Sequence, residues 1–341
     1  MTSNKVAPAP DAMDREALVA RFGELEIKEG VHSYASMQDG WRLHRETWAP
    51  AVAAKAVLLF HVGDGESTQT VGVRRLAHAC NKRGIILETF DANGFGDSLE
   101  KNGKLVLGKA FRGQSIEPTS KKSDHMVEMA ELVVTERKLP LIIAGHSGGG
   151  AATCVATDRI IAICDQHGVP FVTALYLSPG LGFFKTLAPC GLTCCRLCLL
   201  PTCWVCCFCG CCGQPCLSAH NPELNPKGVL GEDNTLKYAH FSNLFANAAP
   251  FPQGGADVPD AAAHMSTLKS GLIFTGTKGT PETTFVKKAP ELGELVPALT
   301  VESREGLTHD YLNMNKDGDP TSGETIEFLV GWAEAKLNEL A

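Results

Sequence analysis

Short apolar runs alternate with stretches of helical periodicity along most of this 341-residue chain. Runs of hydrophobic residues with little charge predict strands at 56–60, 85–90, 139–144, 171–177, 272–275 and 298–303. Apolar positions three or four residues apart predict helices at 70–83, from a capping Ser123 to Val134, after 147 to His167, and from 321 onwards. Strands and helices that alternate over short connections favour a mostly parallel sheet covered by helices on both faces.

The alternation starts late and is interrupted once. Two alternating runs flank Asp39-Gly40 within 31–48 and predict an antiparallel hairpin where the sheet begins. No clean strand pattern occurs between 182 and 263, which is too long for a loop in a compact domain and predicts an inserted cap. We therefore expect an N-terminal extension at 1–28, a core in two parts at 29–181 and 264–341, and the cap at 182–263.

The strand at 139–144 runs into a turn of small residues, Gly145-His146-Ser147-Gly148-Gly149. A strand, a tight turn and a helix in this order are typical of a nucleophile elbow, in which the serine takes a strained backbone conformation. Small residues are needed because a side chain at Gly145 or Gly149 would clash with the neighbouring strand or helix. With Ser147 at the start of a helix, the N–H of Gly148 can face an oxyanion. The pattern favours a catalytic Ser147 over a Gly-rich turn without chemistry.

Composition and short motifs limit the binding partners, cofactors and cellular location that we expect for the protein. The formal net charge is −7, and basic residues form no cluster larger than a pair, so we expect no nucleic-acid partner. Residues 1–30 contain no apolar core of the signal-peptide type, so we expect a cytoplasmic protein, and Thr2 excludes N-myristoylation. Gly94-x-Gly96 lacks the third glycine of a dinucleotide-binding turn and precedes no helical pattern, which argues against a nucleotide cofactor.

A serine at its ordinary pKa is a weak nucleophile and needs an imidazole within hydrogen-bond reach. Of the eleven histidines, His309 is best placed, because its loop follows the last predicted strand and precedes the last helix. The alternative is that His309 is an ordinary loop histidine without a catalytic role. We expect His146 to point into the sheet and fill a core role, and His61 to hydrogen-bond the loop that follows it.

Several motifs occur together along the chain. They are Asp39-Gly40 with Leu43 and Trp48-Ala49-Pro50, then Gly63-Asp64-Gly65-Glu66, then Asp91-Ala92-Asn93-Gly94-Phe95-Gly96-Asp97-Ser98, the elbow at 145–149, and Gly306 with His309. Together they resemble the opening hairpin, oxyanion loop, Asp-x-x-Gly-x-Gly-x-Ser loop, elbow and histidine loop of the monoacylglycerol lipase and lysophospholipase branch of the α/β-hydrolases, also grouped as serine aminopeptidase-like hydrolases. The resemblance implies the α/β-hydrolase fold and the chain order serine, acid, histidine.

This sequence departs from the family at the oxyanion loop. The family's His-Gly pair is replaced here by His61-Val62-Gly63, so the second donor could be the N–H of Gly63 or that of Asp64. We expect Gly63, because an anionic side chain beside a developing oxyanion would oppose its stabilisation.

The chain also departs at the acid. The family's acid falls at the position of Gly279, and the nearest carboxylate is Glu282. Glu282 either reaches back to orient His309 or is a solvated loop residue, in which case the triad lacks its acid. Loss of the orienting carboxylate alone would lower the rate by about 10⁴, as in the serine proteases.

Eleven of the fourteen cysteines lie between Cys190 and Cys216. Zinc is one interpretation, but the two Cys-x-x-Cys pairs stand only four residues apart without a carboxylate or histidine to support them. The odd number of cysteines in this stretch and the expected cytoplasmic location argue against disulfides. Leucine, tryptophan, valine and phenylalanine surround these cysteines, which favours an interfacial segment with S-palmitoylation over a cap packed on the core with free thiols. The other three, Cys80, Cys154 and Cys164, fit buried structural thiols.

We therefore expect a serine hydrolase of carboxylic esters that acts through an acyl-enzyme, of monoacylglycerol or lysophospholipid type. Ser147 attacks, His309 transfers the proton, Glu282 orients His309, and the N–H groups of Gly148 and Gly63 hold the oxyanion. No cofactor or metal is implied, and the partners are a small lipid ester and the cytosolic face of a membrane, docked through the cap. The alternatives are a peptidase or thioesterase of the same fold, or a catalytically weak Cys-rich module that binds membranes or metal. The sequence sets no oligomeric state.

Overall fold

The computed structural model describes residues 30–63, 66, 68, 70–93, 97–98, 100–105, 119–181, 256–278, 282–309, 311–312 and 321–340. The strands are β1 Val31–Ser36, β2 Trp41–Trp48, β3 Ala56–His61, β4 Ile85–Phe90, β5 Glu100–Lys101, β6 Lys104–Leu105, β7 Leu141–His146, β8 Phe171–Leu177, β9 Gly271–Gly276 and β10 Leu299–Arg304. The helices are α2 Val71–Lys82, α3 Thr119–Arg137, α4 Ser147–His167, α10 Val258–Ala263, α11 Glu282–Leu295 and α12 Thr321–Asn338. The expected N-terminal extension at 1–28 and the Cys-rich stretch at 190–216 lie outside the described residues.

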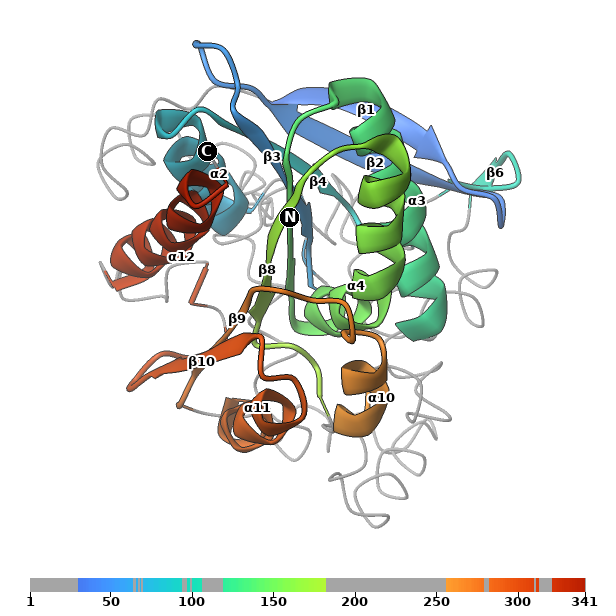
Figure 1. Ribbon diagram of the computed structural model, residues 1–341. Coiled ribbons are helices and arrows are strands. Elements are labelled where there is room, and N and C mark those ends of the chain that lie inside the picture. The colour runs from blue at the N-terminus through green and yellow to red at the C-terminus, as the bar shows by residue number, and fades with distance from the viewer. Residues whose placement is uncertain are drawn as a thin grey trace, which may run out of the picture.

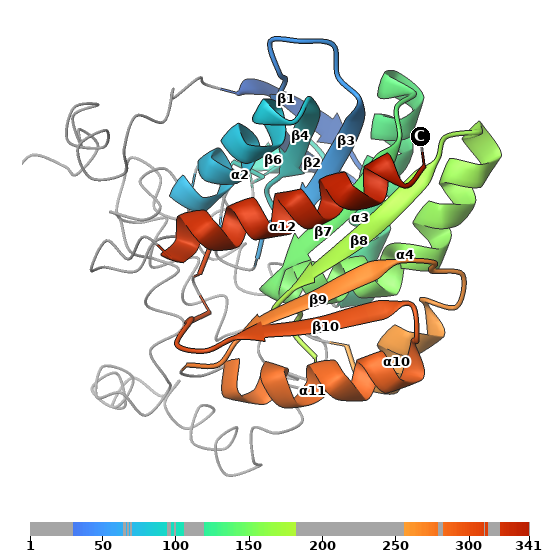
Figure 2. The same cartoon turned by 60° about the vertical axis from the view of Figure 1, so that its left-hand side comes forward.

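One large sheet forms the centre of the molecule (Figures 1 and 2). Its strand order is β10-β9-β8-β7-β3-β4-β2-β5-β6, with β1 paired to β2. Neighbours from β10 to β4 run parallel, whereas β2 is antiparallel to both β1 and β4. The mostly parallel sheet and the opening hairpin predicted from the sequence are confirmed.

The sheet separates two hydrophobic cores. One contains side chains from α3, α4, α10 and α11, and the other contains side chains from α2 and α12. Figure 2 shows α12 crossing one face of the sheet while α3 and α4 lie behind the other. Strand β7 supplies both cores in turn, because Leu141 and Ile143 face one and Ile142 and Ala144 face the other. A strand covered on both faces has no polar side, which is why β7 is apolar from Leu141 to Ala144.

The predicted ends of α2 and α4 agree with the structure to within one residue, and those of α3, expected at Ser123 and Val134, do not. Thr70 caps α2 by accepting a hydrogen bond from the Val73 N–H, and α4 ends at Gly168, which has a left-handed φ of 65°. Ser123 was expected to cap the next helix, but α3 begins earlier, at Thr119. Ser123 lies inside this helix. Its hydroxyl donates to the Ser120 carbonyl at 2.7 Å, so the polar side chain has a partner within the helix.

The described residues on either side of 182–255 lie at neighbouring points of the core. Leu181 and Ala256 form a parallel bridge, and Val258 and Ala261 of α10 belong to the hydrophobic core. Val258 and Ala261, which fall within the range expected for the cap, therefore pack in the hydrophobic core. The Gly180 N–H donates to the Ser147 carbonyl at 2.9 Å, so the last described residues before 182 lie beside the elbow.

Three thiols lie within the described residues, Cys80, Cys154 and Cys164, and all are buried and unbridged, as predicted. Burial raises the pKa of Cys80 and of Cys164 to about 12, so neither is a thiolate at neutral pH. None of the described helices has the length and apolar content needed to span a membrane.

Candidate active site

The turn at Ser147 has the geometry that its sequence predicts. Strand β7 ends at His146 and α4 begins at Ser147, which takes a left-handed φ of 54°. This conformation is uncommon and costly for a residue with a side chain, and residues held in it occur often at active sites. A Cβ added at Gly145 would meet Thr153 and the Gly149 backbone, and one added at Gly149 would meet the His61 carbonyl. Glycine is therefore required at both positions.

The structure brings Ser147, His309 and Glu282 together in one hydrogen-bonded chain. His309 Nε2 lies 2.9 Å from Ser147 Oγ, and His309 Nδ1 lies 2.6 Å from Glu282 Oε1. Because an ionised carboxylate only accepts, Nδ1 carries the hydrogen, and Nε2 is left to accept the proton of the serine hydroxyl. This arrangement can activate a hydroxyl nucleophile.

Glu282 is the first residue of α11, and its side chain is fully buried. Its Oε2 accepts the Gly276 N–H at 2.6 Å and the Ser178 hydroxyl at 2.8 Å. Burial acts to raise the pKa of Glu282, but the hydrogen bond and charge of His309 and the bond from Ser178 outweigh it and hold the pKa below its usual value. The interpretation of Glu282 as a solvated loop residue is wrong. Gly279 lies outside the described residues.

Main-chain bonds fix the loop that carries His309. The N–H groups of Thr277 and Lys278 donate to the Leu307 carbonyl at 3.0 and 2.9 Å, and the Gly306 N–H donates to Thr277 Oγ1 at 3.0 Å. Gly306 has a φ of 82°, a conformation that glycine adopts without steric cost. The histidine loop is thus tied to the chain that leaves β9, four residues before Glu282.

The two predicted oxyanion donors differ in their surroundings. Gly148 is the second residue of α4, where backbone N–H groups have no partner within the helix, so its N–H can bind an anion. The Gly63 N–H donates to Glu66 Oε2 at 2.7 Å instead. This bond does not favour Gly63 as an oxyanion donor, because a main-chain nitrogen has one hydrogen. The alternative, Asp64, lies outside the described residues.

A second histidine adjoins the first. His146 is buried, as the sequence predicts, but in place of a core role both ring nitrogens contact the candidate site: Nδ1 lies 3.0 Å from Glu66 Oε1 and Nε2 lies 3.0 Å from the His309 carbonyl. His61 Nδ1 bonds the Val62 carbonyl at 2.8 Å, which agrees with its expected contact to the following loop.

The sequence assigned no role to Glu66 or Ser178, although both contact the candidate triad or its neighbour. Glu66 stands within the oxyanion motif, and Ser178 directly follows the buried strand β8 at the same edge of the sheet. These two positions were the signals in the sequence from which a role near the active site could have been predicted. Their partners are 80 and 104 residues away in the chain, so only the fold reveals the contacts.

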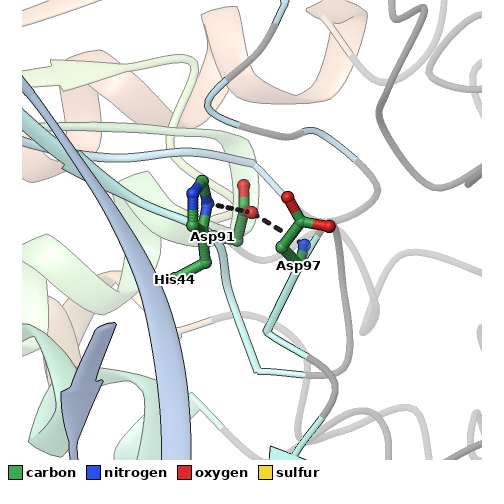
Figure 3. Close-up of side chains that lie close together, drawn as sticks. All are labelled: His44, Asp91 and Asp97. Carbon is green, nitrogen blue, oxygen red and sulfur yellow. Dashed lines mark hydrogen bonds and ion pairs between the residues drawn. The ribbon is translucent and has the colours of Figure 1, made fainter. Parts of the chain in front are cut away.

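His44, Asp91 and Asp97 form a separate cluster whose ligand-type atoms lie within 4.8 Å of one another (Figure 3). His44 Nδ1 and the Asp97 main-chain N–H both bond Asp91 Oδ2, each at 2.9 Å, and the Thr68 N–H bonds Oδ1 at 2.7 Å. The other ring nitrogen of His44 lies 3.0 Å from His32. The buried ring nitrogens of His44 and the carboxylate oxygens of Asp91 already have hydrogen-bond partners. The cluster therefore fits a structural hydrogen-bond network that holds Asp97 and Thr68 better than a metal site.

No known family model and no curated protein matches this sequence. Among solved structures, the chain is similar to a lipase in its open form, with a TM-score of 0.59 and 15% identity over 90% of this chain and 99% of that one. It is similar to a soluble variant of monoglyceride lipase from Saccharomyces cerevisiae in complex with a substrate analogue, with a TM-score of 0.53 and 14% identity over 92% of this chain and 97% of that one.

A third similar structure is brefeldin A esterase, described as a bacterial homologue of human hormone-sensitive lipase. Its TM-score is 0.54 at 13% identity, and the match covers 96% of this chain and 85% of the esterase. At such identities the similarity shows a shared fold, which here is the α/β-hydrolase fold.

Proposed function

We propose that this α/β-hydrolase-fold protein is a serine hydrolase that cleaves carboxylic esters through an acyl-enzyme. The observation that carries the proposal is the continuous chain from Ser147 Oγ through His309 to Glu282, at 2.9 and 2.6 Å, with the serine held at a left-handed φ. An ion pair without a catalytic role would not require the strained backbone at Ser147.

The steps follow from the positions of these groups. Ser147 Oγ attacks the ester carbonyl carbon while His309 Nε2 takes its proton, and the Gly148 N–H binds the oxygen that becomes negative. His309 then returns the proton to the departing alcohol, which leaves an acyl-Ser147 ester. A water molecule, deprotonated by His309, attacks this ester and releases the carboxylic acid and the free hydroxyl. Glu282 holds the ring in the required tautomer and balances the charge of the imidazolium.

The substrate class is the finer part of the proposal. We propose a monoacylglycerol or lysophospholipid because of the family resemblance of the motifs and the apolar residues between 190 and 216. The same stretch, with eleven cysteines, supports peripheral membrane association strengthened by S-palmitoylation, since two acyl chains give stable anchoring. Liposome flotation of the full-length protein, with and without enzymatic acylation, tests the membrane part, and failure to float in both states would refute it.

Active-site labelling tests the enzymatic part directly. We expect a fluorophosphonate probe to label the wild-type protein and not the Ser147→Ala variant. Ester, thioester and aminoacyl substrates should then rank with carboxylic esters first, and monoacylglycerols should be cleaved faster than short soluble esters. Labelling that persists in Ser147→Ala, or none in a folded wild-type protein, would refute the proposal. Faster cleavage of aminoacyl or thioester substrates would favour a peptidase or thioesterase.

A further inference from the structure

The ring of His146 lies between two groups that accept hydrogen bonds. Its Nε2 is 3.0 Å from the His309 main-chain carbonyl oxygen, and its Nδ1 is 3.0 and 3.1 Å from the two carboxylate oxygens of Glu66. A carbonyl oxygen can only accept, so Nε2 carries a hydrogen. Whether Nδ1 also carries one depends on the state of Glu66.

The surroundings of Glu66 favour its ionised form. Burial acts to raise the pKa of this carboxyl, but the charge and hydrogen bond of His146 and the bond from the Gly63 N–H together lower it. The Gly63 N–H donates to Oε2 at 2.7 Å, and a hydrogen bond donated to a carboxylate stabilises its ionised form. With Glu66 ionised, the short contact to His146 Nδ1 is attractive only if Nδ1 is protonated. Both ring nitrogens then carry hydrogens, and His146 is a buried imidazolium.

We infer that Glu66 and the imidazolium of His146 are positioning residues that fix the main chain of His309 against the elbow. The pair joins three segments of the site: the loop after β3 through Gly63, the end of β7 one residue before Ser147, and the histidine loop through the carbonyl of His309 itself. The inference rests on the proposed function, because it assigns a role in placing His309 for proton transfer. The contacts that carry this role are those of the pair with the Gly63 N–H and the His309 carbonyl.

The groups that face His146 explain why its proton matters. Besides Glu66, they are His309, with ring centroids 4.7 Å apart, and Tyr311, edge-on at 5.7 Å, while the charge of Glu282 is also felt by the ring. Removing the Nδ1 proton would leave a lone pair facing the Glu66 carboxylate and two buried carboxylates without a nearby cation. The pair would separate, and the hydrogen bond to the His309 carbonyl would weaken. We therefore expect kcat to fall on the alkaline side when the pair loses its proton.

The protonation state is measurable without any activity. In ¹⁵N-histidine-labelled Ser147→Ala at neutral pH, we expect the His146 ring to show hydrogens on both nitrogens. In Ser147→Ala/Glu66→Gln it should show one, on Nε2, because a neutral amide donates to Nδ1 in place of accepting from it. The difference between the two spectra assigns the signal. A neutral His146 ring in the protein that retains Glu66 would overturn the inference.

Kinetics test the positioning role. Glu66→Ala should lower kcat by about 10² with a smaller change in KM, the scale of loss expected for a misplaced catalytic group. Glu66→Gln, which keeps the size of the side chain and its contacts but cannot titrate, should lose less and should move the alkaline limb of kcat to higher pH. An alkaline limb identical in wild type and Glu66→Gln would refute the positioning role.

Asp39→Asn is the matched control. It removes a carboxylate that likewise contacts a buried histidine, His125 at 3.1 Å, but lies in the turn between β1 and β2, and it should leave the pH profile of kcat unchanged. If the wild-type protein neither hydrolyses esters nor reacts with fluorophosphonate, the proposed function fails, whereas the nitrogen spectra still decide the state of His146.

Discussion

At the scale of single residues, the acid of the candidate triad is Glu282. The resemblance to the lipase family places the acid three residues earlier, at the position of Gly279. Glu282 reaches His309 because it begins a helix, where negative charge is stabilised, and because its carboxylate is held by the Gly276 N–H and the Ser178 hydroxyl. Ser178 itself has a φ of 40°, and Tyr311 lies 3.3 Å from its oxygen. Burial and the charge of Glu282 raise the pKa of Tyr311 well above its usual value, so it stays neutral beside the carboxylate.

Replacing Glu282 tests whether this carboxylate completes the triad. We expect Glu282→Gln to lower kcat by about 10⁴ with little change in KM, because the amide can donate to His309 Nδ1 and so selects the wrong tautomer. Glu282→Asp, one methylene shorter, should give an intermediate loss. Ester hydrolysis under saturating substrate is the measurement.

Glu291→Gln is the control for this change. Glu291 lies on the same helix, α11, but is exposed and pairs with Lys288, so its kcat should equal that of the wild type. A Glu282→Gln enzyme that retains kcat within about tenfold of the wild type would show that the triad functions without this acid, which contradicts the assignment.

At the scale of elements, the sequence predicted what depends on local pattern. The apolar runs of β3, β4, β7 and β8 and the ends of α2 and α4 agree with the structure because uniform burial and capping residues leave a signal in adjacent positions. The helix α11 was not predicted, since Pro290 lies inside it and proline usually ends a helical pattern. The short strands β5 and β6, two residues each, are too brief for a periodic pattern.

The residues of the candidate site likewise divide into those that a local pattern predicts and those whose contacts only the fold shows. Ser147 and His309 were predictable because one sits in a motif and the other follows from strand order. The contacts of Glu66 and Ser178 were not, because a pattern within a few residues carries no information about a partner 80 or more positions away. For Glu282, the sequence left two interpretations open, and burial against His309 separates them.

An ion network joins α3 to the antiparallel edge of the sheet. Glu88 on β4 is fully buried, and its oxygens accept Arg45 Nε at 2.9 Å, the Thr47 hydroxyl at 2.7 Å and Arg137 at 2.6 Å. Arg45 on β2 also donates to Glu136 of α3 at 2.7 Å. The hydrogen-bonding capacity of Glu88 is thus filled, as a buried charge requires.

Removing Glu88 should destabilise the fold rather than alter the chemistry. We expect Glu88→Ala to lower the free energy of unfolding by about 3–5 kcal/mol, because Arg45 stays buried without its main counter-ion. Glu100→Ala breaks the more exposed Arg42–Glu100 pair of the same region and should cost less than about 1 kcal/mol. Urea denaturation of both variants measures the difference, and equal losses would contradict a specific role for the buried network.

At the scale of the whole molecule, the candidate active site gathers at one edge of the sheet. The segments that follow β3, β7, β8, β9 and β10 at their carboxyl ends supply Glu66, Ser147, Ser178, Glu282 and His309. Parallel strands bring such segments together, which is why open α/β sheets bind ligands at this edge. Leu181, the last described residue before the predicted insertion, follows Ser178 by three residues.

Shortening the insertion tests how far the core and its chemistry are independent of it. Because Leu181 and Ala256 lie side by side, a Gly/Ser linker of about six residues can replace 182–255 at a small cost in closure entropy. We expect this variant to unfold cooperatively in urea, to react with fluorophosphonate at Ser147, and to cleave a short ester within about tenfold of the full-length rate, since the triad residues all lie outside 182–255. Its preference for long acyl chains over short ones should be lost if the apolar stretch at 190–216 contacts the lipid. A folded, labelled variant with an unchanged chain-length preference would separate the hydrolase chemistry from the proposed lipid contact and place substrate selection within the core.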